Sequence, residues 1–181
     1  YGADVARWVV MSDSPPERDV EWTAAGAEAA ARHLARVWRL VESFEAERDS
    51  VGRDASEPPG EEATALRRAT HRAIADVTEG IEGFAFNKAI ARLYEFTNQL
   101  AKVTATTPDA RAAHRFALRA LAQLMAPMTP HLAEEMWAAL GGEGLVARAP
   151  WPEADPEMLA TASVVLSVQI NGKRRAEVVA P

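Results

Sequence analysis

The chain has 181 residues, of which 48% are hydrophobic and 25% charged, and it carries a net charge of −6 and no cysteine. This composition is typical of a globular domain; it argues against overall disorder and a basic nucleic-acid coat, and the lack of cysteine excludes disulfides and thiolate metal sites. No apolar run approaches the roughly 20 residues of a membrane span, and the first residues lack a signal-peptide pattern. We therefore expect a cytoplasmic protein without a membrane partner.

The first third of the chain predicts a short helix, a loop and a long helix. Residues 3–11 form the short helix, and the stretch SDSPPERDVEW at 12–22 ends it because proline donates no backbone N–H. Thr23 is the expected N-cap of the long helix, whose apolar residues recur at spacings of three and four. These residues are Ala27, Ala30, Ala31, Leu34, Val37, Trp38, Val41 and Phe44. The polar stretch at 49–60 predicts a connection after this helix.

The middle of the chain predicts three more long helices in succession. Residues 61–82 carry an apolar helical period, and Asn87 is expected to cap the next helix. We expect TTPD, around Pro108, to end that helix, after which a further helix extends to Met125.

A sharp turn then precedes a shorter fifth helix. Pro127 forms the turn, Thr129 is the expected N-cap, and Pro130 occupies the first helical position. Gly141 ends the helix. Short connections between most of these helices favour antiparallel neighbours, so we predict a mainly α fold, an antiparallel up-and-down bundle.

The tail predicts a short C-terminal β-hairpin. Residues 164–170 alternate apolar and polar, and Asn171-Gly172 is a strong hairpin-turn signal. We expect a glycine bulge at Gly172, with Leu166 opposite Ala176, because this register keeps one face apolar. A lone hairpin is marginal in water, so we expect partner strands beyond the chain and a truncation at both ends.

No catalytic or metal-binding constellation is visible. Of the four histidines, only His131 stands near a carboxylate at helical spacing, Glu134, and the order is the reverse of the Glu-x-x-His motif of bundle metal sites. We expect no metal site, and histidines that lie on the surface or in caps. The sequence GGEG at 141–144 fits a helix end better than a phosphate-binding loop.

Two groups of basic residues have two open interpretations each. Arg32, Arg36 and Arg39 are spaced by four and three, which places them together on the side of the helix opposite its apolar face. They predict either a solvated outer face or a track of phosphate contacts. Lys173, Arg174 and Arg175 follow the hairpin turn, where they either protect a sheet edge or contact phosphate.

Several segments together resemble the class I aminoacyl-tRNA synthetases, and specifically the bacterial leucyl-tRNA synthetases. The segments are YGADVARWVVMSDSPPERDVEW, ARVWRLV, HRAIADVTEGIEGFAFNKAIARLYEFTNQL, LMAPMTPHLAEEMWAALG, APWPEAD and VQINGKRRAEV. The Ala-Pro-x-x-Pro-His-x-x-Glu-Glu-x-Trp pattern is common to related class I enzymes. The Phe-Asn-x-Ala-Ile-Ala segment and the Asn-Gly-Lys hairpin narrow the resemblance to the leucine-specific enzymes. Ala176 departs from the family, which usually has glycine there.

The resemblance implies a division of the chain and a role for it. Residues 1–22 would be a connecting, stem-contact segment, 23–150 a helical bundle of the anticodon-binding type, and 151–181 a linker with the first hairpin of a C-terminal domain. The bundle would bind tRNA(Leu) through phosphates, and the basic residues above would be its tRNA-binding residues. A catalytic domain in cis, with ATP and Mg²⁺, would leucylate the tRNA. The chain contains neither the His-Ile-Gly-His nor the Lys-Met-Ser-Lys-Ser signature of the class I enzymes, so we expect it to need no cofactor and to be inactive.

Two alternatives to this role remain open. The first is the equivalent domain of a valyl-tRNA or isoleucyl-tRNA synthetase. The second is a helical protein-interaction module without RNA, in which the arginines meet an acidic protein partner.

Overall fold

The computed structural model describes residues 1–46, 60–160, 164–170 and 173–180, and for residues 46, 164–170 and 173–180 it describes the backbone only. The helices are α1 (Ala3–Asp13), α2 (Ala24–Ala46), α3 (Glu61–Glu82), α4 (Phe86–Leu100), α5 (Pro108–Met125), α6 (Pro130–Ala139) and α7 (Pro156–Leu159), with a 3₁₀ turn η1 (Val146–Arg148). The strands are β1 (Val164–Ile170) and β2 (Lys173–Ala180). None of the helices in the described part is both long and apolar enough to cross a bilayer.

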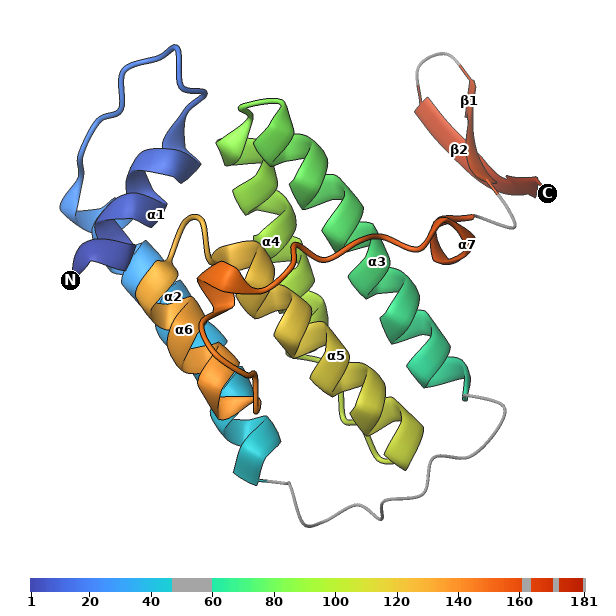
Figure 1. The fold of residues 1–181 in the computed structure, drawn as a ribbon. Coiled ribbons are helices and arrows are strands. Elements are labelled where there is room, and N and C mark those ends of the chain that lie inside the picture. The colour runs from blue at the N-terminus through green and yellow to red at the C-terminus, as the bar shows by residue number, and fades with distance from the viewer. Residues whose placement is uncertain (47–59, 161–163, 171–172, 181) are drawn as a thin grey trace.

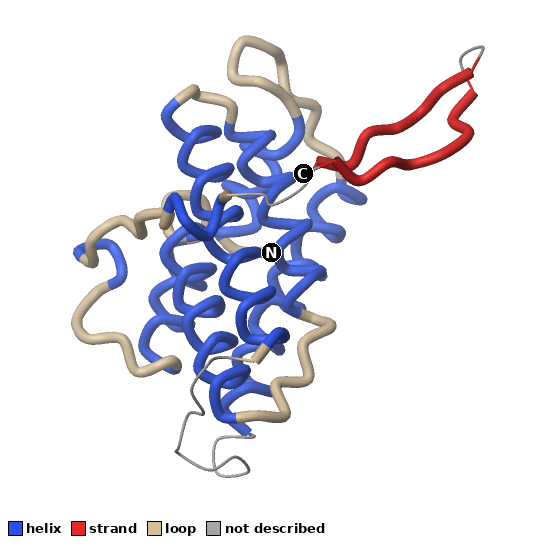
Figure 2. Tube along the Cα trace, turned by 90° about the vertical axis from the view of Figure 1, so that its right-hand side faces the viewer, coloured by secondary structure: helices blue, strands red, loops and turns tan. Residues whose placement is uncertain are grey.

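The long helices form an antiparallel bundle. In Figures 1 and 2, α2 to α6 run along one direction, and each helix is antiparallel to the one before it. Helix α3 packs against both α4 and α5, whereas α1 lies across α2, α4 and α6. The predicted mainly α bundle is therefore confirmed.

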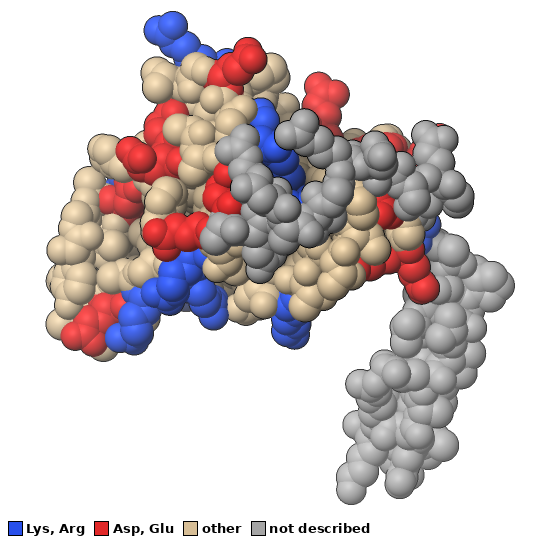
Figure 3. Space-filling model, turned by 90° about the horizontal axis from the view of Figure 1, so that it is seen from below, with Lys and Arg blue, Asp and Glu red and all other residues tan. Residues whose placement is uncertain are grey.

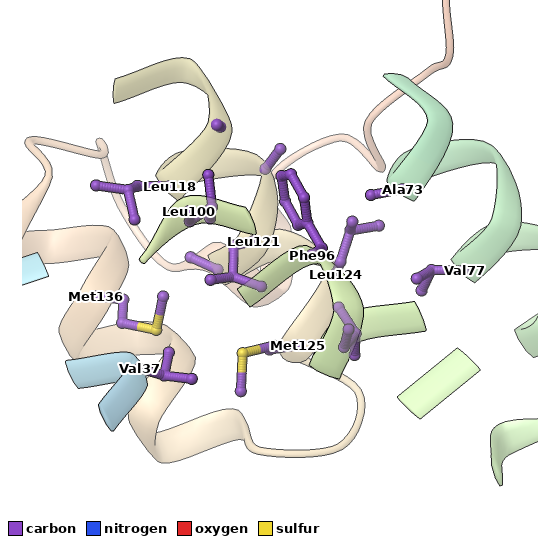
Figure 4. Close-up of a cluster of buried hydrophobic side chains, with 14 of the residues drawn as sticks. Val37, Ala73, Val77, Phe96, Leu100, Leu118, Leu121, Leu124, Met125 and Met136 are labelled. Atoms are coloured by element: carbon purple, nitrogen blue, oxygen red, sulfur yellow. The ribbon is translucent and has the colours of Figure 1, made fainter. Parts of the chain in front are cut away.

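The core lies where these helices meet. Leu121 stands at its centre, with Val37, Met125 and Met136 on one side and Phe96 on the other (Figure 4). The apolar period predicted for α2 is buried as expected, except that Ala31 and Trp38 are only partly covered. Burial of each large aliphatic side chain contributes about 1.5 to 3 kcal/mol, so this contact region dominates the stability of the bundle.

Two predicted helix boundaries are wrong. Helix α4 begins at Phe86 with Ala85 in the N-cap position, so Asn87 lies inside the first turn instead of capping it. Helix α4 ends at Leu100, and TTPD starts α5: the Thr107 hydroxyl accepts a hydrogen bond from Ala110 N at 3.3 Å. A Thr-Pro pair is an N-terminal signal as well as a stop, and here the N-terminal meaning applies.

Two charged residues fasten α1 to the turn between α5 and α6. Arg7 donates from Nε to Met128 O at 3.0 Å and from Nη2 to Pro127 O at 2.6 Å. Asp4 accepts from Leu132 N at 2.7 Å and from His131 Nδ1 at 2.9 Å. Thr129 occupies the predicted N-cap position of α6 and Pro130 the first helical position, but the Thr129 side chain makes no capping hydrogen bond, and Asp4 is the acceptor instead. We call this set of contacts the α1 clamp.

The segment after α6 crosses α5 and α3 to reach α7 (Figure 1). Gln123 Nε2 donates to Pro150 O at 2.8 Å, and the Trp151 indole donates to Thr78 Oγ1 at 2.9 Å. His71 Nδ1 accepts from Asp155 N at 3.1 Å. These contacts hold an irregular segment along the outside of the bundle.

The strands β1 and β2 pair antiparallel, but not in the expected register. Leu166 lies opposite Val178 instead of Ala176. The register of the two strands shifts between Val168, which lies opposite Ala176, and Gln169, which lies opposite Arg174. Pairing of Leu166 with Val178 still matches one apolar residue with another. The expected bulge at Gly172 lies outside the described residues.

Gly80 allows α3 and α4 to approach closely. A Cβ added there would lie 3.0 Å from Ala89 Cβ and 3.1 Å from Ala89 N. Helix propensity alone would make Gly80→Ala stabilising by up to about 1 kcal/mol. We expect it to lower the free energy of unfolding by about 1 to 3 kcal/mol, because the backbone of α4 cannot move away without loss of its packing. Urea denaturation of this variant and of Ala65→Gly, an exposed control on α3 that measures propensity alone, checks this; a more stable Gly80→Ala variant would contradict it.

The α1 clamp predicts a specific cost for the loss of Asp4. Asp4→Ala leaves the backbone N–H groups of His131 and Leu132, 3.4 and 2.7 Å from the Asp4 carboxylate, without their acceptor, so we expect a loss of about 1 to 2 kcal/mol in the free energy of unfolding. The matched control is Asp19→Ala, which removes an exposed loop carboxylate and should change stability by less than about 0.5 kcal/mol. Equal effects of the two substitutions would refute a capping role for Asp4.

Candidate nucleic-acid interface

The arginines of α2 do not share one environment. Arg32 is exposed and lies 3.4 Å from the carboxylate of Glu28, and Arg39 is also exposed. Arg36 is half-buried. With about 100° of rotation per residue, Arg36 is turned from Arg32 toward the buried face, so it stands at the boundary of the core. The expectation that all three project from the outer face holds for Arg32 and Arg39 only.

Arg36 contacts a buried histidine on the same helix. Its Nη2 lies 3.3 Å from His33 Nδ1, and His33 is only 4% exposed. The His33 ring stacks on Trp8 of α1, with ring centroids 5.2 Å apart, and lies 4.1 Å from the ring of Tyr94 of α4. The Trp8 indole donates to the Tyr94 hydroxyl at 2.9 Å, which closes the cluster.

Burial keeps His33 neutral. Desolvation, and secondarily the positive charge of Arg36, lower the pKa of His33 to about 4. His114 is buried in the same way against Phe44, and desolvation with the nearby Arg111 lowers its pKa to about 4. The expectation of surface or capping histidines is therefore wrong for these two. The burial of such a histidine is difficult to predict from the sequence of its own helix, because the rings that cover it come from other helices.

Several arginines outside the two basic groups serve the fold. Each donates to a backbone carbonyl far away in sequence: Arg7 to Pro127 and Met128, Arg72 to Leu159, Arg111 to Phe44, Arg115 to Leu140 and Arg119 to Gly141. Carbonyls at helix ends and in loops lack internal partners, and guanidinium groups supply them. An arginine without such a contact to a backbone carbonyl keeps more of its N–H groups for a ligand.

The second basic group consists of Lys173, Arg174 and Arg175, and the structure describes only its backbone. Lys173 and Arg174 pair through the backbone with Ile170 and Gln169, and Arg175 lies at the register irregularity. Their side chains lie outside the described part of the chain, so their role stays a prediction.

The residues of the reversed histidine–glutamate pair both have structural partners. His131 contacts Asp4, and the Glu134 carboxylate accepts from Val146 N at 2.8 Å and Ala147 N at 3.1 Å. Within the described residues, no cluster of three or more potential ligands for a metal ion occurs.

Negative charge marks one groove away from α2. A cavity of about 540 Å³ lies between α3 and the segment that holds Trp151, and Glu79, Glu82 and Glu153 line it. These carboxylates would repel phosphate. Figure 3 shows basic and acidic side chains interspersed on the described part of the lower end, without a broad basic field. Any phosphate contact therefore depends on individual arginines, and the outer face of α2 offers two exposed ones.

Comparison with known proteins defines the class. The family model described as the anticodon-binding domain of tRNA ligase matches residues 63–181, and the chain belongs to this family. The chain is 63% identical, over all 181 residues, to a leucine–tRNA ligase of Dinoroseobacter shibae, of which it covers 20%. It is 59% identical over 181 residues to a leucine–tRNA ligase of Ruegeria pomeroyi, again 20% of that protein. The chain thus spans about a fifth of the length of these relatives.

A solved structure has the same fold. It is the crystal structure of the ternary complex of Agrobacterium radiobacter K84 agnB2 LeuRS-tRNA-LeuAMS, with a TM-score of 0.82 and 32% sequence identity. The match covers 100% of this chain and 24% of that one. The resemblance to bacterial leucyl-tRNA synthetases is therefore confirmed, over the whole chain.

The two buried histidines predict how stability depends on pH. Since their pKa is lowered to about 4, the unfolded chain binds more protons than the folded one between about pH 4 and about pH 6.5. The stabilising effect is complete above this window, and the free energy of unfolding should fall as the pH drops through it, by up to about 1.4 kcal/mol per pH unit for each histidine. Urea denaturation at a series of pH values checks this, and His114→Phe should make the slope shallower. An unchanged slope in that variant would contradict the prediction.

Proposed function

We propose that the chain is the tRNA-binding helical part of a bacterial leucine–tRNA ligase, and that it orients tRNA(Leu) for leucylation. The observation that carries this proposal is similarity over the full chain to leucine–tRNA ligases and to a LeuRS in a structure that includes tRNA. An equivalent domain of a valyl or isoleucyl enzyme is less well supported, because the relatives named above, which match over the full chain, are leucine enzymes. The catalytic domain, outside this chain, would supply the ATP and Mg²⁺ chemistry in the cytoplasm, and the chain alone would be inactive.

The proposed division of labour follows the predicted domains. Residues 1–22 would connect the bundle to the catalytic part and contact the tRNA stem, 23–150 would form the tRNA-binding bundle, and 151–181 would lead through the hairpin of β1 and β2 into a C-terminal domain. The α1 clamp supports a firm connection, since it ties the first of these segments to the second by hydrogen bonds in both directions.

The proposed tRNA contacts are phosphate contacts. Arg32, Arg36 and Arg39 would meet the RNA backbone from α2, and Lys173, Arg174 and Arg175 would add contacts from the hairpin. Guanidinium groups match phosphate geometry and remain charged at every physiological pH. Arg32 and Arg39 are seven residues apart, or about 10 Å along the helix, so both can contact one strand of RNA at different phosphates.

The test is tRNA binding by the intact ligase in a salt series. Arg32→Glu with Arg39→Glu should weaken binding of tRNA(Leu) and make the plot of log affinity against log salt shallower by about two units, one per lost contact. Because both side chains are exposed, the free energy of unfolding should change by no more than about 0.5 kcal/mol per site. Leucine-dependent pyrophosphate exchange without tRNA reports separately on the catalytic domain.

The matched control is Arg68→Glu, which makes the same charge change at an exposed position on α3. It should alter the salt slope far less than the α2 variant does. Equal effects of both would mean that only net charge matters. If the wild-type enzyme bound tRNA without salt dependence, a module for an acidic protein partner would be the better account of the arginines.

A further inference from the structure

We propose that His33 is a positioning residue that holds the guanidinium of Arg36 in place for an RNA phosphate. The inference rests on the proposed tRNA-binding function and adds to it a residue with no contact to the RNA. In this arrangement the three α2 arginines divide into two kinds: Arg32, beside Glu28, and Arg39 are exposed on the surface, whereas Arg36 is oriented by a group inside the bundle.

The first support is the rigidity of the His33 ring. Trp8 is fully buried, and its indole N–H donates to the Tyr94 hydroxyl, so the two rings that contact His33 are held to each other. They come from α1 and α4, which means that three helices determine the orientation of one imidazole. A ring packed in this way presents Nδ1 in one direction, toward Arg36.

The second support is the nature of the acceptor. Neutral imidazole accepts the N–H of Arg36 through Nδ1 and carries its own proton on Nε2. An imidazole without charge leaves the charge of Arg36 intact, unlike the carboxylate of Glu28 beside Arg32. Within the described part of the chain, no carboxylate lies within ion-pair distance of Arg36. The side chain is thus oriented but not neutralised.

The third support is the burial of the Arg36 stem. Arg36 Nε is buried and has no hydrogen-bond partner among the described residues. A guanidinium held at Nε by packing and at Nη2 by His33 keeps its remaining N–H groups for an anion from solvent. An arginine ordered before binding loses less side-chain freedom when the phosphate arrives, so its contact is stronger than that of a mobile arginine.

The experiment is a double-mutant cycle in the intact ligase, with tRNA(Leu) as the probe. Arg36→Ala should weaken tRNA binding about tenfold, as expected for loss of one charge-assisted contact, and make the salt slope shallower by about one unit. His33→Phe keeps the stacked ring but removes the acceptor, and should weaken binding about threefold, with a raised KM for tRNA and an unchanged kcat. The effect of His33→Phe should disappear in the Arg36→Ala background, because His33 acts only through Arg36.

Arg32→Ala provides the matched background. His33→Phe should weaken binding there by the same factor as in the wild type, since Arg32 does not contact His33. His33→Asn, whose amide oxygen can stand near the position of Nδ1, should bind tRNA more tightly than His33→Phe although it lacks the ring. If His33→Phe does not fold, His33→Asn is compared in the same way with His33→Leu, which also lacks an acceptor.

Three results would overturn the positioning role while leaving the proposed function in place. The first is that the effects of His33→Phe and Arg36→Ala on tRNA affinity are additive. The second is that Arg36→Ala has no effect although the double variant Arg32→Glu with Arg39→Glu weakens binding. The third is that His33→Asn binds tRNA no more tightly than His33→Phe. Failure of the proposed function itself has a different signature, because then no arginine variant on α2 changes tRNA affinity or its salt dependence.

Discussion

The α1 clamp is the contact on which the rest of the arrangement depends. The two side chains bind backbone groups of opposite kinds. The Asp4 carboxylate accepts from N–H groups at the start of α6, and the Arg7 guanidinium donates to carbonyls in the α5–α6 turn. Trp8 follows directly in sequence and enters the core beside His33. The clamp thereby fixes how deeply and at what angle α1 lies on the bundle, and with it the shape of the site that encloses His33.

The same contacts give a structural meaning to the segment APMTPHLAEEMW. Its prolines break the helix, which frees carbonyls for Arg7 and N–H groups for Asp4. Glu134 caps η1, and Trp137 packs on Gly142, where an added Cβ would collide with the indole, while Arg119 lies 4.4 Å from the Trp137 ring. A motif that is common to related synthetases is therefore accounted for by packing between elements, and it need not touch tRNA.

The existence of the long helices could be predicted because the apolar period of each lies in its own residues, although the boundaries predicted for α4 were wrong. The apolar period of α2 and the Thr23 cap, whose hydroxyl accepts from Gly26 N at 3.1 Å, need no information from elsewhere in the chain. The failures have the opposite character. Thr129 occupies the predicted N-cap position, but the acceptor there is Asp4 of α1, and His33 is covered by Trp8 of α1 and Tyr94 of α4. For the same reason sequence spacing grouped Arg36 with Arg32 and Arg39, although only the tertiary structure reveals its contact with His33.

Net charge explains why such orientation would matter for this chain. At −6, the molecule as a whole repels RNA, and at physiological ionic strength a surface charge acts over only about 8 Å. Exposed arginines on α2 can therefore attract a phosphate that is already near, but they contribute little at long range. Affinity must then come from short-range contacts, in which the geometry of each guanidinium counts more than the number of positive charges. A buried neutral imidazole provides that geometry without adding charge, whereas a carboxylate in its place would orient Arg36 and cancel the charge it presents.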